Sequence, residues 1–356
     1  MAGRHGGRRW PVVLATVAGL GVLGAAGYVL RDDLAELVGT ESPSPEARAS
    51  RPAPGPTLSV TPPPPSPTPP PRERLVIHGT GDVNLDPAYI PNLTANGYRY
   101  AWSGLGGLFR RDDLTVINLE CPVSELRDPR DKEFVFLCDP AALPAARQAG
   151  VDVANQANNH GYDHGPEALL DSLRNLRRAG IAPVGAGRGP HRALAPAELQ
   201  VGGWRVAVVG LGMVIDPPEQ VAAPGHPGTA AGHDAEAMLR AIRAAERQAD
   251  LVIVTIHWGV ELDTEPRPEQ VELGRAFVRA GADVIFGHHA HRLQPLDHYR
   301  GRPIFWGLGN FVWPNFSAPG SITAVAEVVV RPNGSIRGSL LPAHIEAAGH
   351  PVLLRR

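Results

Sequence analysis

Residues 281–295 read GADVIFGHHAHRLQP. The short apolar run Asp283–Phe286 has the length of a buried β-strand, and His288, His289 and His291 follow it directly. In extended backbone, residues i and i+2 point to the same side, so His289 and His291 can aim two imidazoles into one crevice. Neutral imidazole is the commonest metal ligand, and the stretch therefore predicts a strand that ends at a metal site.

Four earlier candidate strands also end in polar residues. They are Leu75–His78, Thr115–Asn118, Val151–Asn155 and Leu251–Ile256. The polar residues at or just after their ends are Asp82 and Asn84, Asn118 and Glu120, Asn158 to His160, and His257 and Glu261. Ligands of open α/β sheets gather outside the carboxyl ends of strands, so we expect these side chains to share one site.

Each of these motifs is weak when it stands alone. Gly-Asp after a strand usually makes a turn, a lone histidine is usually structural, and Asn-Asn-His before Pro166 also suits a helix cap. Together, however, two carboxylates, an amide and three histidines on separate strands match the mixed nitrogen and oxygen ligands of a two-metal hydrolase.

The rest of the chain after Arg74 alternates short apolar runs with helical patterns, which indicates an α/β domain. Further strands are expected at Val206–Leu211, Ile304–Leu308 and Ile322–Val330, and helices at Pro166–Ala179, Asp234–Gln248 and Pro268–Ala280. The glycine-rich run 185–189 lacks the full dinucleotide fingerprint and a following helix, so we expect a loop there.

Five ordered blocks resemble one known family. GDVNLD, INLECPVS, NQANNHGYDHG, HWGVE and GADVIFGHHAHRLQP, within Leu75 to Pro314, are similar to the poly-γ-glutamate capsule synthesis (CapA) family of the calcineurin-like metallophosphoesterase superfamily. The resemblance implies a four-layer α/β/β/α sandwich of metallophosphatase type. It also implies two divalent metal ions, for which Mn, Fe and Zn all suit the ligands.

The family pattern of GDxH, GD, GNH, H and GHxH assigns a role to each matching position. The implied metal ligands are Asp82, Glu120, Asn159, His257, His289 and His291. His160 matches the residue that steadies or protonates the leaving group. Supporting or substrate-contacting roles are implied for Asn84, Asn118, Asp163, Glu261, His288 and Asn310.

Two positions depart from that pattern. Asn84 stands where the histidine of GDxH is expected, and Glu120 replaces the second aspartate. One metal position has therefore lost a ligand or uses a different one, which bears on metal occupancy and catalytic power.

The chain has two cysteines, Cys121 and Cys138, and Cys121 adjoins Glu120. A disulfide between them would fasten the intervening loop and stabilise the fold by ~3 kcal/mol. Two buried free thiols are the alternative, because sequence spacing cannot show that the two Cβ atoms approach closely enough.

The N-terminal region differs from the rest of the chain. Residues 11–30 are uncharged and long enough to cross a hydrocarbon layer of ~30 Å, and Arg4, Arg8 and Arg9 precede them. We expect a single-pass anchor with the C-terminal domain outside the cell membrane. Secretion after signal cleavage is the alternative.

Amino-acid composition separates a linker from the folded domain. Residues 31–73 are rich in proline and serine, which favours a disordered linker. The expected order is a cytoplasmic N-terminus (1–10), the transmembrane signal anchor (11–30), the linker (31–73), the CapA-like domain (74–346) and a C-terminal tail (347–356). A net charge of −2 indicates no nucleic-acid partner.

Three classes of function fit these observations. The first is a metal-dependent phosphoesterase that acts on an anionic or phosphorylated envelope polymer or its precursor. The second is an accessory factor that works with membrane-bound capsule synthesis proteins. The third is a non-catalytic polymer-binding or scaffold protein. Fold membership does not choose among them, because function depends on the site.

Overall fold

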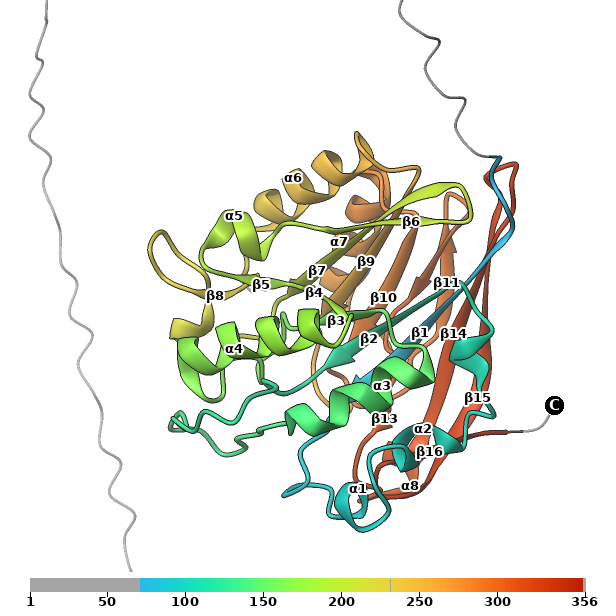
Figure 1. Cartoon of the computed structure of the whole chain (residues 1–356). Helices are drawn as coiled ribbons and strands as arrows, with labels where there is room; N and C mark the ends of the chain where they lie inside the picture. Colours follow the sequence, from blue (N-terminus) through green and yellow to red (C-terminus); the bar gives the residue numbers. More distant parts are fainter. Residues whose placement is uncertain (1–70, 231, 355–356) are drawn as a thin grey trace, which may run out of the picture. The chain divides into compact units, whose positions relative to one another are not determined.

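The computed structural model describes residues 71–230 and 232–354 (Figure 1). The expected cytoplasmic segment, the anchor at 11–30 and residues 31–70 of the expected linker lie outside the described residues. Among the residues that are described, no helix has both the length and the apolarity needed to cross a membrane.

The larger sheet, called sheet A, is mixed. Its path within the described residues is β16 (His350–Leu353), β15 (Ile336–Ala347), β14 (Ile322–Val330), β1 (Leu75–Val83), β2 (Leu114–Leu119), β3 (Val153–Asn155) and β4 (Ala182–Val184). The strands β1 to β4 run parallel, β14 is antiparallel to β1, and β13 (Asn310–Val312) pairs with the end of β1. The carboxyl ends of β1, β2 and β3 therefore meet at one edge.

The second sheet, called sheet B, has a parallel centre. Its order is β11 (Leu296–Tyr299), β12 (Arg302–Phe305), β10 (Val284–His288), β9 (Leu251–His257), β7 (Trp204–Gly212) and β6 (Ala197–Val201). The strands β12, β10, β9 and β7 are parallel, whereas β11 and β6 pair antiparallel at the two edges. A separate short pair joins β5 (Ala186–Gly187) to β8 (Gly228–Thr229).

Helices cover the outer face of each sheet. On sheet A lie α1 (Asn92–Ala95), α2 (Tyr100–Ser103), the 3-10 turns η1 (Leu108–Arg110) and η2 (Pro140–Ala142), α3 (Leu143–Ala149) and part of α4 (Gly165–Arg178). On sheet B lie α6 (Ala235–Glu246) and α7 (Pro268–Arg279). Shorter elements are α5 (Pro190–Ala193), η3 (Pro218–Gln220) and α8 (Ala318–Ser321). In Figure 1, α3 and α4 (green) lie together on sheet A.

The two sheets face each other across a shared core, and β9 shows how the sequence builds it. Leu251 and Ile253 point into the core between the sheets, whereas Val252, Val254 and Ile256 pack under α6 and α7. All five are at most 1% exposed, and each such side chain contributes ~1.5–3 kcal/mol of hydrophobic stabilisation. The layers are therefore helices, sheet, sheet and helices, in the expected order.

The sequence located the central elements well and missed several short or edge elements. The three expected helices correspond to α4, α6 and α7, and every expected strand has a counterpart. Two expectations were wrong. The segment 347–356 is not a tail, because β16 pairs with β15 within it. The glycine-rich run 185–189 is not wholly a loop, because it contains β5 and α5 follows it.

Candidate metal centre

Asp82, Glu120 and His257 form a buried cluster, called here the inner group. Each residue is 0% exposed, and one ligand atom from each lies within 4.8 Å of the others. Asp82 is in β1 and Glu120 follows β2, both in sheet A, whereas His257 ends β9 of sheet B. His257 Nδ1 lies 3.1 Å from Glu120 Oε1. The inner group therefore forms where the carboxyl ends of the two sheets meet.

Glu261, His289 and His291 form a second cluster, the outer group. Their ligand atoms also lie within 4.8 Å of one another, and Glu261 is exposed, so this group opens to solvent. His291 Nδ1 lies 3.2 Å from Asp82 Oδ2, which makes the two groups adjacent. Glu261 was expected in a supporting role, and the structure instead places it among potential ligands.

The histidine loop after β10 has an unusual backbone. His289 and His291 have φ values of 87° and 50°, in the left-handed region that residues other than glycine rarely adopt. The backbone N–H of His289 donates to Asp82 Oδ2 at 3.3 Å, and this contact helps to hold the loop. Such conformations persist where the surrounding structure imposes them, and they cluster at functional sites.

The donor atoms of both groups fit a divalent metal. Within the described residues, Glu120 Oε2 and His289 Nδ1 are buried and have no hydrogen-bond partner. Leaving such atoms unsatisfied normally costs free energy, and each is an atom that Mn, Fe or Zn accepts as a ligand. The residues present therefore suit a metal centre.

Burial and mutual charge shift the pKa values of the cluster. Burial, together with the charge of Asp82, raises the pKa of Glu120 well above its usual value. Burial and the neighbouring histidines lower the pKa of His257 well below its usual value and that of His289 to about 4. His257 and His289 are therefore neutral near pH 7, which is the form that binds metals.

Asp82 and His291 shift in opposite senses because they contact each other. Burial alone would raise the pKa of Asp82, but the hydrogen bond and charge of His291 outweigh burial and lower that pKa. Burial alone would lower the pKa of His291, but the charges of Glu120 and Asp82 raise it to about 9. The contact thus favours a cationic His291 imidazole beside an ionised Asp82.

The loop between β3 and α4 brings two more predicted residues to the site. Asn159 Oδ1 lies 2.8 Å from His257 Nε2, beside the inner group. His160 Nδ1 lies 2.8 Å from Asp163 Oδ2, and Asp163 also accepts the backbone N–H of Phe136 at 2.7 Å. Asp163 therefore fixes the orientation of the His160 ring.

Lys132 is a neighbour of the site that the sequence interpretation missed. Its ammonium donates to the carbonyl oxygen of Asn159 at 2.7 Å and forms an ion pair with Asp163, 2.9 Å from Oδ1. A second carboxylate, that of Asp216, lies 3.4 Å away. The signal was present in the sequence, because Lys132 is the single lysine among 34 basic residues.

Asn118 lies at the centre of the inner group. Its amide nitrogen is 2.9 Å from Asp82 Oδ1, 3.1 Å from His257 Nδ1 and 3.3 Å from Glu120 Oε1. Its amide oxygen accepts hydrogen bonds from Asn155 and Asn158. Asn118 therefore links the three residues of the inner group to the loop that follows β3.

The remaining predicted residues occupy supporting positions. Asn84 Oδ1 accepts the backbone N–H of Asp86 at 2.8 Å, so this oxygen already supports a turn. The ring nitrogens of His288 lie 3.3 Å and 3.0 Å from the carbonyl oxygens of Ile256 and Thr80, which leaves the supporting role and not the substrate contact. Asn310 Oδ1 lies 2.8 Å from His291 Nδ1.

Cys121 and Cys138 form a disulfide, with their Cα atoms 5.6 Å apart. Of the two alternatives left by the sequence, the structure therefore has the pair and not the free thiols. The bond closes the loop that carries Lys132 and Phe136, and Cys121 directly follows Glu120.

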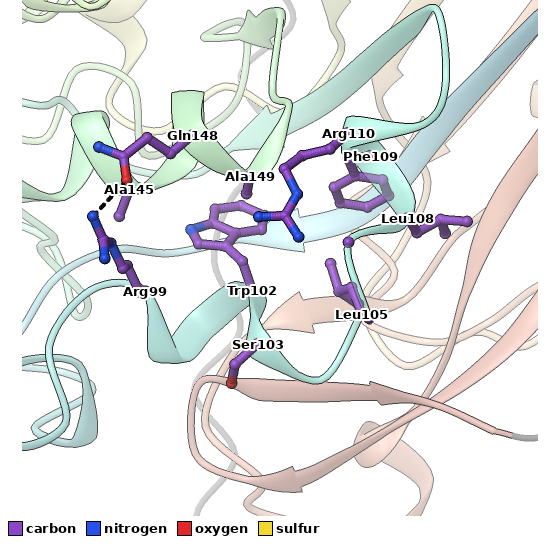
Figure 2. A pocket seen from close by; sticks show the side chains of 12 residues that line it. Arg99, Trp102, Ser103, Leu105, Leu108, Phe109, Arg110, Ala145, Gln148 and Ala149 are labelled. Carbon is purple, nitrogen blue, oxygen red and sulfur yellow. Dashed lines mark hydrogen bonds between the residues drawn. The ribbon is translucent and has the colours of Figure 1, made fainter.

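A hollow of about 380 Å³ lies elsewhere, between α2, η1 and α3 (Figure 2). Its lining includes Arg99, Trp102, Phe109 and Gln148, and Arg99 donates to Gln148 Oε1 at 2.8 Å. None of the residues that line this hollow belongs to the inner or outer group.

The model of the family "Bacterial capsule synthesis protein PGA_cap" matches residues 76–315. The chain belongs to the PGA_cap family. The matched region contains every predicted site residue, from Asp82 to Asn310.

Curated relatives of this PGA_cap chain carry related names. "PGA biosynthesis protein CapA" of Bacillus subtilis is 33% identical over 249 residues, 69% of this chain and 65% of that protein. "Capsule biosynthesis protein CapA" of Bacillus anthracis is 30% identical over 283 residues, 77% of this chain and 68% of that protein. The resemblance to the CapA family is thereby confirmed. The chain spans about two thirds of the length of these relatives.

Two solved structures are similar to part of the chain at low identity. A hypothetical protein from Thermus thermophilus has a TM-score of 0.47 at 18% identity, with 75% of this chain and 99% of that chain covered. The NAD nucleotidase of Haemophilus influenzae has a TM-score of 0.48 at 14% identity, with 80% and 54% covered. Because both scores lie below 0.5, neither likeness supports a conclusion about function.

Proposed function

We propose that this PGA_cap protein is a metal-dependent hydrolase of the phosphoesterase type, with a fold of metallophosphatase type, that acts in the synthesis of a capsule or envelope polymer such as poly-γ-glutamate. The observation that carries the proposal is the pair of adjacent inner and outer groups at the carboxyl ends of strands from both sheets. Each group supplies the carboxylates and imidazoles of a divalent metal site.

The residues that would hold two metal ions are Asp82, Glu120, Asn159, His257, His289 and His291, and the outer group adds Glu261. When bound, such ions supply Lewis-acid polarisation of a phosphoryl oxygen and a lowered pKa of water. The identity of the metal, Mn, Fe or Zn, depends on geometry and on availability in the cell.

His160 would donate a proton to the leaving group or stabilise its charge. Its Nδ1 faces Asp163, which leaves Nε2 as the atom available to a bound ligand. Burial lowers the pKa of His160, and the hydrogen bond and charge of Asp163 oppose that effect. Asp163 thus holds the imidazole in one orientation, and its hydrogen bond and charge favour the protonated ring that a general acid requires.

The proposed setting is outside the cell membrane. Residues 11–30 would anchor the chain, residues 31–73 would separate the domain from the membrane, and membrane-bound capsule synthesis proteins would be the partners. The supporting observations are the uncharged N-terminal run and the disulfide, since disulfides persist in oxidising compartments.

Metal analysis of the full-length chain, purified without chelator, tests the proposal. We expect about two ions of Mn, Fe or Zn per chain. His289→Ala should reduce this content, whereas the control variant His298→Ala, at an exposed position in β11, should leave it unchanged. Wild type should then hydrolyse at least one phosphomonoester or phosphodiester, and His160→Ala should turn it over more slowly.

A non-catalytic polymer-binding or scaffold role is the second candidate. Asn84 favours it, because Asn84 stands where the family pattern has a histidine and its amide oxygen already accepts from Asp86. Absence of metal in wild type even after reconstitution would contradict the hydrolase and favour this role.

A further inference from the structure

A contiguous set of aromatic side chains lies against the candidate metal centre. We call Tyr89, Phe134, Phe136, Trp313 and Phe316 the aromatic rim. The ring of Phe136 lies 4.2 Å from that of His160, and the ring of Trp313 lies 4.7 Å from that of His291. The rim thus contacts both the proposed proton donor and the outer group.

The members of the rim also contact one another. Tyr89 lies 4.5 Å from Phe136, 5.9 Å from Trp313 and 5.8 Å from Phe316, and Phe136 meets Trp313 edge-on at 5.9 Å. Phe134 lies 6.5 Å from Phe136. These spacings are those of paired aromatic rings, so the rim forms one connected cluster that begins beside His160.

The outer part of the rim faces solvent. Phe316 is 74% exposed and Phe134 is 51% exposed, whereas Phe136 and Trp313 are buried. Val260 and Leu262, on either side of Glu261, are also exposed, at 40% and 59%. Contiguous exposed apolar groups on a soluble domain often mark a binding surface.

The loop that carries Leu262 is held in a strained conformation. Leu262 has a φ of 66°, which is unfavourable for a bulky residue, and its backbone N–H donates to the carbonyl oxygen of Ala290 at 2.8 Å. The hydrogen bond ties the loop to the histidine segment 289–291. The exposed Leu262 therefore occupies an imposed position beside the outer group.

The charges near the rim are mixed: the Arg292 guanidinium donates to the carbonyl oxygen of His291 at 2.8 Å, and two further charged residues lie close to the site. The cation that approaches His160, Lys132, has a side chain only 4% exposed and is already paired with Asp163 and Asp216. Glu261, the exposed member of the outer group, is itself acidic. An aromatic face beside a metal centre suits a flat ring, which stacks on Phe or Trp without any need for a cation.

We propose that the aromatic rim binds a planar aromatic ring joined to the phosphoryl group that the metal centre would take. The inference rests on the proposed hydrolase and specifies its substrate class as an aryl or nucleoside phosphate. The ring would pack on Phe316 and Tyr89 while its phosphoryl group reaches His291 and His160. This class differs from a chain of aliphatic carboxylates, such as a polyglutamate.

Calorimetric titration of the full-length, metal-loaded protein tests the proposal with probes that share a phosphate group. The probes are 1-naphthyl phosphate, uridine 5′-monophosphate, cyclohexyl phosphate and inorganic phosphate. We expect at least one aromatic phosphate to bind about three- to tenfold more tightly than cyclohexyl phosphate, because stacking adds to the attraction of the phosphate. The two aromatic probes separate an aryl source from a nucleoside source.

Substitutions in the aromatic rim test whether the rim causes the tighter binding of the aromatic phosphate. Phe316→Ala, Phe316→Leu and Phe134→Ala should each weaken the aromatic probe about threefold or more, while binding of inorganic phosphate stays unchanged. Tyr299→Ala, which removes an aromatic side chain from β11 at the other end of the parallel strands, is the matched control and should behave as wild type. The exposure of Phe316 and Phe134 makes these substitutions tolerable for folding.

Three results would overturn the proposal. The first is equal affinity for aromatic and cyclohexyl phosphates, and the second is unaltered binding of the aromatic probe in all rim variants. The third is a polyglutamate that binds more tightly than either aromatic probe and whose affinity does not change in Phe316→Ala. Binding of the aromatic probe without hydrolysis of any phosphoester would uphold the rim and contradict the hydrolase. The two failures are therefore distinguishable.

Discussion

Lys132 is the single lysine of the chain, and it lies beside the candidate metal centre. The chain uses arginine at every other basic position, yet it has lysine where the side chain is only 4% exposed. An ammonium is a compact point charge with three donors, whereas the planar guanidinium of arginine needs more room. The site next to Asp163, Asp216 and the carbonyl oxygen of Asn159 is therefore matched to lysine.

Lys132→Met keeps the length of the side chain and removes its charge. The substitution would leave Asp163 without its cationic partner. Because Asp163 is fully buried, we expect the free energy of unfolding to fall by about 3–5 kcal/mol. Urea denaturation measures the change. Asp216→Asn is the matched control: the Asp216 side chain is 54% exposed, so its loss should cost less than about 1 kcal/mol. Equal losses in the two variants would show that burial of Asp163 is not the cause.

The disulfide loop is the element that joins the aromatic rim to the proposed proton donor. We expect the denatured, unreduced protein to titrate no free thiol, because both cysteines of the chain are paired. The double variant Cys121→Ser/Cys138→Ser should lose about 3 kcal/mol of stability, since the unfolded chain regains loop entropy. Reductant should lower the Tm of wild type towards that of the variant and leave the variant unchanged. Two free thiols in the unreduced protein would contradict the pairing.

The contact between β7 and the residue before β9 should make the stability of the fold depend on pH. Hydrogen bonds from Arg205 lower the pKa of Asp250 to about 2, and the charge of Arg72 acts in the same sense. A carboxyl whose pKa is lower in the folded state stabilises the fold above its unfolded pKa of 3.8, and this contribution is lost as the pH falls towards 2. Asp250→Asn should therefore destabilise the protein at pH 6 and have a smaller effect near pH 2.5.

The expected size of the Asp250→Asn effect is below about 1 kcal/mol, because the arginine partners are about half exposed and solvent screens their charges. Thermal unfolding of wild type and variant across this pH range measures the difference between them. A difference that stays constant from pH 6 to pH 2.5 would rule out the ionised carboxylate as its source.

The elements also explain which parts of the fold the sequence could predict. Buried parallel strands such as β9 and β10 are continuous apolar runs, and α4, α6 and α7 carry regular apolar spacing with proline or an acidic cap at the start. β15 was missed because it is half exposed and contains Gly338 and Pro342, residues that usually interrupt strands. β16 was missed because its pairing with β15 depends on a hairpin rather than on its own pattern.

Some residues of the candidate site could be predicted from the sequence and others could not. Residues at the ends of predicted strands, such as Asp82 and His257, were found because topology alone brings strand ends together. Lys132 and the aromatic rim were missed because they lie in loops, and loop residues reach the site through tertiary contacts that no short-range period records. The departure at Asn84 was visible in the sequence, but its contact with Asp86 was not.

At the scale of the whole molecule, the candidate metal centre joins the two sheets. Its residues come from β1 and β2 of sheet A and from β9 and β10 of sheet B, together with the segments that follow them. Bound metal would therefore stabilise the folded state by about 2.7 kcal/mol at a free concentration one hundred times the Kd. Chelator should lower the Tm of wild type by several degrees and leave that of His289→Ala unchanged. An identical Tm with and without chelator would show that metal does not stabilise the fold.

The order of strands in sheet A has a consequence for how the protein is made. β1 begins at Leu75, but its antiparallel neighbour β14 does not begin until Ile322, and Leu75 pairs with Val330. During synthesis, β1 therefore keeps one unpaired edge until nearly the whole domain has emerged, and such edges invite association between chains. A chain stopped before Ile322 would hold all the predicted metal ligands and still lack the strand that completes their sheet. β14, which follows every predicted metal ligand in the sequence, is thus the strand that covers the free edge of β1 as the nascent chain completes sheet A.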